Sequence, residues 1–288
     1  MKRDAFVAGT LACLAPRAAS AETLYAAVER IAQTASGITG VYARRLGGSV
    51  ADVSYNSEEQ FPAASTIKLL ILVTAFQLAE NDAGLMDRIV RLRAGDMVGG
   101  SDMLQNAAPG SPYSVRQLVR AMIVKSDNTA SNALITTFGF ERINATARRA
   151  NLKHTQLKRH FLDYTAIVRH SENLTTPHDI GALMYQIERG AHEGIPTLAS
   201  SVSCRKMIDI MLHQEDRDKI PRALPKGTPI ANKTGEVDFV RNDVAIVDPY
   251  GDAPYVLSVL TKGLQNYGDG LTAIRKIAKT VHASLTRS

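Results

Sequence analysis

Residues 61–80 read FPAASTIKLLILVTAFQLAE, and this stretch decides which fold class the chain is assigned to. From Thr66 to Glu80 the run is apolar and long enough to predict a helix. The pattern S-x-x-K, Ser65 to Lys68, stands at the start of that helix. Because residues three apart on a helix share a face, the Lys68 amine can reach the Ser65 hydroxyl. The stretch therefore predicts a helix that opens with a reactive serine–lysine pair.

Strand-like runs flank a helical middle section. Periodicity and composition predict helices at 22–36, 66–80, 114–138 and 270–285, and strands at 40–46, 49–55, 239–247 and 255–261. Because the strands come from both ends of the chain, we expect them to share one antiparallel sheet. The predicted fold class is α/β (α+β) and two-lobed. An antiparallel sheet flanked by helices stands beside an all-α lobe, with a substrate cleft between them.

Residues 22–288 are expected to form one catalytic domain. Its sheet lobe comprises 22–60 and 205–288, and its helical lobe comprises 61–204. A chain of 288 residues can bury a substantial core, and its 45% hydrophobic and 22% charged residues are ordinary for a globular protein. No run approaches the roughly 20 apolar residues that a membrane span needs.

The first 21 residues are typical of an export signal. Lys2 and Arg3 form a basic start, residues 5–15 an apolar run, and residues 19–21 a small-residue cleavage site. The apolar run has the length of a signal-peptide core and is too short to span a bilayer. We therefore expect an exported protein, periplasmic or secreted.

Charge and ligand patterns exclude several function classes. The formal net charge is +6, yet no block of five or six like charges occurs, so no nucleic-acid partner is expected. Cys13 would leave with the signal, and Cys204 alone forms neither an intramolecular disulfide nor a cysteine metal site. No histidine spacing predicts a metal site. We expect a monomer that uses no metal or organic cofactor and acts on a small molecule.

Two further motifs follow the serine–lysine pair. A Ser-Asp-Asn triplet at 126–128 stands in a break between helical runs, and a Lys-Thr-Gly triplet at 233–235 begins a predicted strand. A serine hydroxyl becomes a good nucleophile when a neighbouring base takes its proton. Lys68 is a candidate for that base if burial or the charge of Lys233 lowers its pKa. A second S-x-x-K match at 203–206 precedes a much shorter helix, and we interpret it as a chance match.

The remaining motif residues suggest substrate contacts. Ser126 could pass a proton to a leaving amine, and Asn128 could hold a substrate amide. Lys233 and Thr234 suit a substrate carboxylate, and Gly235 would let a substrate lie against the strand as an added edge. Taken singly, each motif also has a structural explanation. Lys68 could be a solvated helix lysine, Ser126 a turn cap and Gly235 a strand kink. Their order and spacing favour the catalytic interpretation.

With these motifs the sequence resembles the class A β-lactamases and class A-like penicillin-binding proteins, members of the serine β-lactamase superfamily. The segments that resemble the family's surroundings of the three motifs are 61–65, 110–115, 129–132 and 175–177. The resemblance implies a β-lactamase/transpeptidase-like fold and an acyl-enzyme at Ser65. It also implies an oxyanion hole made by the backbone amides of Ser65 and Glu236, with Arg241 as a ligand of the substrate carboxylate.

The resemblance breaks in the loop between residues 157 and 173, where class A β-lactamases carry a glutamate that activates the deacylating water. That position falls here on Phe161 or Leu162, and neither can act as a base. Asp163 is either a replacement base or an anchor of the loop. Glu236 stands where β-lactamases usually have a small residue, and it points either into the cleft, altering substrate choice, or to solvent. We expect acylation followed by doubtful deacylation.

The sequence thus predicts a serine hydrolase of the β-lactamase family that forms an acyl-enzyme with β-lactams. One alternative is a penicillin-binding protein that cleaves D-Ala-D-Ala peptides as a carboxypeptidase, or a related esterase. Another is a receptor that is acylated by a β-lactam and only reports or sequesters it. Peptide turnover separates these two alternatives, because a receptor would release no D-alanine.

Overall fold

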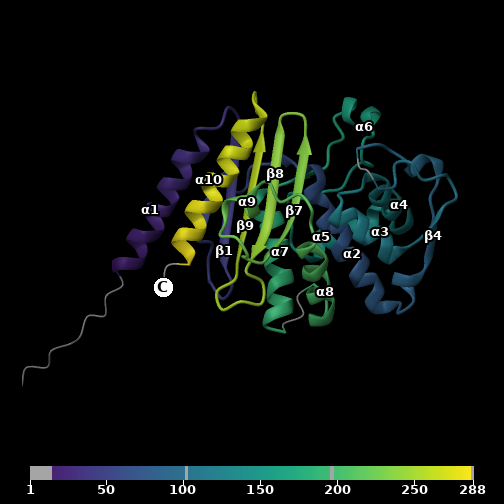
Figure 1. The fold of residues 1–288 in the computed structure, drawn as a ribbon, viewed down its shortest axis with the longest axis horizontal. Coiled ribbons are helices and arrows are strands. Elements are labelled where there is room, and N and C mark those ends of the chain that lie inside the picture. Colours follow the sequence, from purple (N-terminus) through teal and green to yellow (C-terminus); the bar gives the residue numbers. More distant parts are fainter. Residues whose placement is uncertain (1–14, 101–102, 195–197, 287–288) are drawn as a thin grey trace, which may run out of the picture.

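The computed structural model describes residues 15–100, 103–194 and 198–286. A five-stranded antiparallel sheet, in the order β2-β1-β9-β8-β7, forms its centre (Figure 1). Its strands are β1 (Ile38–Arg45), β2 (Val53–Tyr55), β7 (Ile230–Val237), β8 (Val240–Val247) and β9 (Tyr255–Lys262). The N-terminal and C-terminal strands join along the β1–β9 pairing. Strand β7 is therefore an edge strand, with one side free of a strand partner.

Helices cover both faces of the sheet (Figure 1). Helices α1 (Ala15–Ala32) and α10 (Tyr267–Leu285) lie on one face, and α7 (Pro177–His192) and α8 (Ser201–Leu212) lie on the other. Successive side chains of a strand point to opposite faces. In β8, Val244 and Ile246 accordingly enter the core under α7 and α8, whereas Ala245 and Val247 enter the core under α1 and α10.

The helical lobe is built around α2 (Lys68–Asn81), whose residues 68–76 are all buried. The 3₁₀ turn η1 (Ala64–Ile67) precedes it, and α3 (Val115–Val124), α4 (Asn128–Phe138), α5 (Phe140–Arg149) and α6 (Tyr164–Val168) complete the lobe. The minor elements are β3 (Phe61–Pro62), η2 (Leu85–Asp87), β4 (Ile89–Arg91), η3 (Ala94–Asp96), β5 (Pro112–Ser114), β6 (Leu174–Thr175) and α9 (Ile220–Ala223). A helix that is apolar on most sides belongs at the centre of a core, as α2 shows.

The predicted fold class is confirmed, because an antiparallel sheet flanked by helices stands beside a helical lobe (Figure 1). Some predicted boundaries were wrong. The helix predicted at 114–138 is two helices, since the Asp127 carboxylate accepts a hydrogen bond from Ala130 N and so begins α4 afresh. The helix predicted at 22–36 ends at Ala32. The Lys-Thr-Gly triplet lies within β7 and does not begin it.

The predicted export signal lies largely outside the described residues, since only 15–21 of it belong to α1. Its cleavage remains a prediction. Of the helices in the described part of the chain, none combines the length and apolar character that crossing a membrane requires. The predicted lobe boundary between 204 and 205 falls inside α8, which contacts both β7 and α2.

Candidate active site

Ser65 lies where the edge of the sheet meets the start of the central helix. It belongs to η1, and the preceding Ala64 has a left-handed backbone with φ of 47°. Strand β7 runs against this turn so closely that a Cβ at Gly235 would stand 3.0 Å from both Ser65 N and Ala63 O. A side chain here would press against the backbone of η1, so the close approach favours glycine. The packing therefore brings the Lys-Thr-Gly strand alongside the predicted nucleophile.

Ser126 lies between two buried amines. Its Oγ is 3.2 Å from Lys68 Nζ and 3.0 Å from Lys233 Nζ. Its backbone is left-handed, with φ of 56°, a strained conformation for a residue other than glycine. The capped start of α4 follows directly and holds this turn in place. Three segments far apart in the sequence thus converge on one hydroxyl.

Lys68 is fully buried and donates hydrogen bonds to Ser126 O at 2.6 Å and to Asn128 Oδ1 at 2.9 Å. Burial, and then the charge of Lys233, hold the pKa of Lys68 well below its ordinary value. Among the residues that the structure describes, no hydrogen bond joins the Ser65 hydroxyl to this amine. A lowered pKa favours the unprotonated amine, which is the form that a general base requires.

Lys233 is also fully buried, and it donates to Thr234 O at 2.9 Å as well as to Ser126. Burial lowers the pKa of Lys233 to about 7, although the carboxylates of Asp216 and Asp243 act in the opposite direction. The amine therefore changes its charge near neutral pH. Because Lys233 Nζ lies beside Ser126, this change of charge takes place at the centre of the site.

A cleft of about 1070 Å³ opens above these groups. Its lining includes four predicted residues, Ser65, Ser126, Asn128 and Thr234, together with Glu236. The cleft also exposes further acidic side chains: Glu172, Glu215, Asp216 and Asp238. The predicted nucleophile thus faces a volume large enough for a small-molecule ligand.

Phe161 faces Lys68 from the opposite wall of the cleft. Its ring centroid lies 4.4 Å from Lys68 Nζ, a cation–π distance. The side chain of Asn132 fixes the backbone here, because its Oδ1 accepts from Phe161 N at 2.8 Å and its Nδ2 donates to Phe161 O at 3.2 Å. We call residues 157–173 the 157–173 loop. At the point where this loop approaches Lys68, it presents an aromatic ring.

The two carboxylates of this loop and its His160 ring make contacts of their own. The Asp163 carboxylate accepts from Ala166 N at 3.0 Å and so caps α6, and Asp163 is not part of the cleft lining. This geometry favours the anchoring interpretation over the replacement base. Glu172 does line the cleft, but its Oε1 is 2.6 Å from Arg159 Nη2. His160 stacks edge-on against Phe140.

Arg241 does not line the cleft. Its guanidinium donates to Val237 O at 3.0 Å and to Val240 O at 2.6 Å, and it stacks over the Tyr267 ring at 3.8 Å. These contacts tie the β7–β8 turn to the start of α10. The expected role in binding a substrate carboxylate is therefore not supported by its position.

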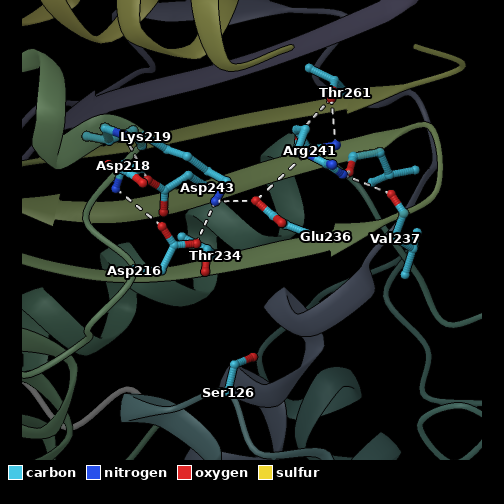
Figure 2. A network of polar contacts seen from close by, with 12 residues as sticks. Ser126, Asp216, Asp218, Lys219, Thr234, Glu236, Val237, Arg241, Asp243 and Thr261 are labelled. Atoms are coloured by element: carbon cyan, nitrogen blue, oxygen red, sulfur yellow. Dashed lines mark hydrogen bonds and ion pairs between the residues drawn. The ribbon is translucent and has the colours of Figure 1, made fainter. Parts of the chain in front are cut away.

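A charged cluster behind β7 was missed by the sequence interpretation. Lys219 forms ion pairs with Asp216 and Glu236 (Figure 2). Its Nζ lies 2.6 Å from Asp216 Oδ2 and 2.6 Å from Glu236 Oε1. Asp243 is buried next to it, and burial raises the pKa of Asp243 to about 7 despite the charge of Lys219. The dense charges of residues 215–219 were the available signal, but no spacing rule connects them to residues 236 and 243. Glu236 lines the cleft, and its carboxylate is directed to Lys219 (Figure 2).

Comparisons with known proteins point to one family. The model described as "Beta-lactamase enzyme family" matches residues 23–285. Beta-lactamase L2 of Stenotrophomonas maltophilia is 29% identical over 283 residues, covering 94% of this chain and 89% of the relative. The solved structure of PBP-A is 27% identical and has a TM-score of 0.81, and the match covers 91% of this chain and 95% of the PBP-A chain. A leucine-to-glutamate variant of PBP-A was solved as an acyl-enzyme complex with penicillin G. It is 27% identical, has a TM-score of 0.82, and the match covers 91% of this chain and 96% of the variant.

Proposed function

Because the chain belongs to the beta-lactamase enzyme family, we propose that it is a serine hydrolase in which a β-lactam acylates Ser65. The observation that carries the proposal is the position of Ser126 Oγ between the amines of Lys68 and Lys233, beneath a cleft lined by Ser65. A hydroxyl held between two amines can accept a proton from one side and release one to the other.

In the proposed acylation, Ser65 Oγ attacks the lactam carbonyl carbon and its proton passes to the unprotonated amine of Lys68. The ring C–N bond then breaks, Ser126 gives its proton to the leaving nitrogen, and Lys68 returns a proton to Ser126. The lowered pKa of Lys68 supports its role as base. The missing Ser65–Lys68 hydrogen bond is consistent with this role, because catalytic hydrogen bonds often tighten only with substrate bound.

The proposed oxyanion hole consists of the backbone amides of Ser65 and Glu236. The close approach of Gly235 to Ser65 N supports this assignment, because it brings the two segments into contact. Lys233 and Thr234 are the proposed ligands of a substrate carboxylate, and Asn128 is the proposed ligand of its amide. Asp163 is left out of the proposed catalytic set, since its carboxylate is used as a helix cap.

Slow deacylation is the second part of the proposal. Hydrolysis of the acyl-enzyme needs a base for the attacking water, and the 157–173 loop offers the Phe161 ring at the place that faces Lys68. This observation also favours a second candidate function, a penicillin-binding protein that cleaves D-Ala-D-Ala peptides. The likeness to PBP-A supports that candidate. Export to the periplasm or the medium is proposed for either function.

Intact mass spectrometry of the purified protein with benzylpenicillin, sampled over hours, tests the proposal. We expect a penicilloyl adduct that forms and persists, and none on a Ser65→Ala variant. Ser203→Ala, in the second S-x-x-K match, is the matched control and should acylate like the wild type. An adduct that disappears while penicillin is consumed would contradict slow deacylation. The absence of an adduct on the wild type would overturn the assignment of Ser65.

A further inference from the structure

Helix α6 presents exposed apolar side chains to the cleft. Tyr164 and Ile167 are three residues apart, so their side chains share one face of the helix. Both line the cleft, and their exposed fractions are 68% and 37%. Val168 is 79% exposed but lies outside the cleft lining. Exposed apolar side chains that gather in a cleft indicate a contact surface for an apolar group of a ligand.

Other parts of the chain add apolar groups to the same lining. Leu162 lines the cleft just before the Asp163 cap of α6. Met103 and Val237 also line it, and they are 50% and 37% exposed. Val237 ends β7, and Figure 1 shows the β7–β8 turn and α6 at the same end of the molecule. We call Leu162, Tyr164 and Ile167 the α6 wall.

The α6 wall is held in a fixed place by hydrogen bonds. The Asn132 side chain binds the backbone of Phe161 on both sides, at 2.8 and 3.2 Å, directly before the wall begins. The Asp163 carboxylate caps α6 by accepting from Ala166 N at 3.0 Å. A surface that is already in position binds an apolar group without the entropy cost of ordering a loop. The wall is therefore suited to select a ligand group by shape and polarity.

The charged side chains of the cleft lining have partners of their own. The ion pairs are Lys125–Glu215, Arg159–Glu172, Lys219–Asp216, Lys219–Glu236 and Arg241–Glu236. The Asp238 carboxylate accepts from Tyr267 Oη at 3.2 Å. Lys233, next to Thr234, is the cation that the proposed function assigns to the substrate carboxylate. The site thus has a cation beside Thr234 and apolar side chains along α6.

The proposed substrate contacts set which part of an acyl donor meets the α6 wall. A donor whose carboxylate binds at Thr234, and whose leaving nitrogen faces Ser126, has its amide at Asn128 in the proposed function. Asn128 adjoins the wall, since a Cβ at Gly100 would lie 2.9 Å from Asn128 Nδ2 and 3.5 Å from Leu162 Cδ1. A substituent carried on that amide therefore extends past Leu162 toward α6.

We propose that the α6 wall is a specificity subsite that selects acyl donors carrying a large apolar group, such as an aromatic ring, on the amide at Asn128. Contact with the wall removes apolar surface of the donor from water, and the Tyr164 ring can stack on an aromatic ring. This inference rests on the proposed function, because it assumes that the donor reacts at Ser65. It extends that function by naming the chemical class of the donor's substituent.

Benzylpenicillin and 6-acetamidopenicillanic acid test the inference, since they differ by one phenyl ring on the acyl side. The second-order rate of acylation is measured for each compound by intact mass. We expect the wild type to react about tenfold faster with benzylpenicillin. Ile167→Ser should reduce this preference by about threefold, and should change the rate with the acetamido compound by less than about twofold. Ile167→Leu keeps an apolar side chain and should keep the preference.

Val168→Ser is the matched control, because it changes an apolar residue of the same helix that lies outside the cleft lining. It should leave both rates unchanged, and thermal unfolding checks that every variant is folded. The inference is overturned if both compounds acylate the wild type at equal rates, if Ile167→Ser slows both equally, or if Val168→Ser has the same effect as Ile167→Ser. If neither compound forms an adduct on the wild type, the proposed function fails and the inference with it.

Discussion

The two walls of the cleft differ in the reactive groups that they present. On one wall, η1, the turn before α4 and β7 bring Ser65, Ser126 and two buried lysines together, with amine-to-hydroxyl distances of 3.0 and 3.2 Å. On the other wall, the 157–173 loop turns a phenyl ring toward Lys68, and its carboxylates are paired or used as caps. In the proposed function, the first wall supplies the groups for acylation, whereas the described residues of the second wall face Lys68 with a ring and have their carboxylates engaged elsewhere.

In the proposed function, the two half-reactions of covalent catalysis are served by separate parts of the chain. The first wall is fixed by buried packing between the lobes, so a change there would disturb the core. The loop is held by side-chain hydrogen bonds, such as those of Asn132 to Phe161, and by the Arg159–Glu172 ion pair. Its cleft-facing residue can change without altering the Ser126 relay. The following predictions test how separate the two walls are.

The largest expected effect is on the first wall. Lys68→Ala should lower the acylation rate with benzylpenicillin by about 100- to 10 000-fold, because general-base catalysis contributes that much. Lys125→Ala is the control, since Lys125 also lines the cleft but forms an exposed ion pair with Glu215. It should change the rate less than about fivefold. Rapid-mixing mass spectrometry gives both rates, and equal losses in the two variants would refute Lys68 as the base.

The second expected effect is on the loop wall. Phe161→Glu places a carboxylate near Lys68, and we expect it to accelerate loss of the acyl group by about 100-fold, with a smaller change in acylation. Phe161→Gln has a similar shape without a base and should deacylate like the wild type. Release of the penicilloyl group, followed by mass, measures both. Equal deacylation of the Glu and Gln variants would show that the loop wall is not where hydrolysis is limited.

The smallest expected effect is in the pH dependence of acylation. Lys68 must be unprotonated, so the rate should fall as pH is lowered through its depressed pKa. Lys233 must be protonated to bind a carboxylate, and its pKa of about 7 means that its charge is lost as pH rises above 7. At pH 8 only about a tenth of Lys233 is protonated. The acylation rate with benzylpenicillin should therefore be about tenfold lower than the rate expected with Lys233 fully protonated. The methyl ester of benzylpenicillin should not show this alkaline decline, and a decline shared by both compounds would contradict the assigned role of Lys233.

The fold class followed from the sequence because its signals are local. The apolar run after Ser65 and the β-branched and apolar residues of 239–247 each act within a few residues. The three motifs were also predictable, since their order and spacing carry the pattern. The boundaries of the helices were less predictable. The break between α3 and α4 depends on the cap at Asp127, which periodicity does not specify.

The sequence by itself determined which residues could act: a serine and a lysine one helical turn apart, a Ser-Asp-Asn turn, a Lys-Thr-Gly strand, and a loop without the expected glutamate. Only the tertiary structure decided what those residues face. It set Phe161 over Lys68, gave Asp163 to a helix cap, turned Arg241 to backbone carbonyls, and joined Glu236 to the buried Lys219. The physical reason is that burial and pairing of charges depend on contacts between segments far apart in the chain, and these contacts set both the pKa of an amine and the substrate charge that a cleft accepts.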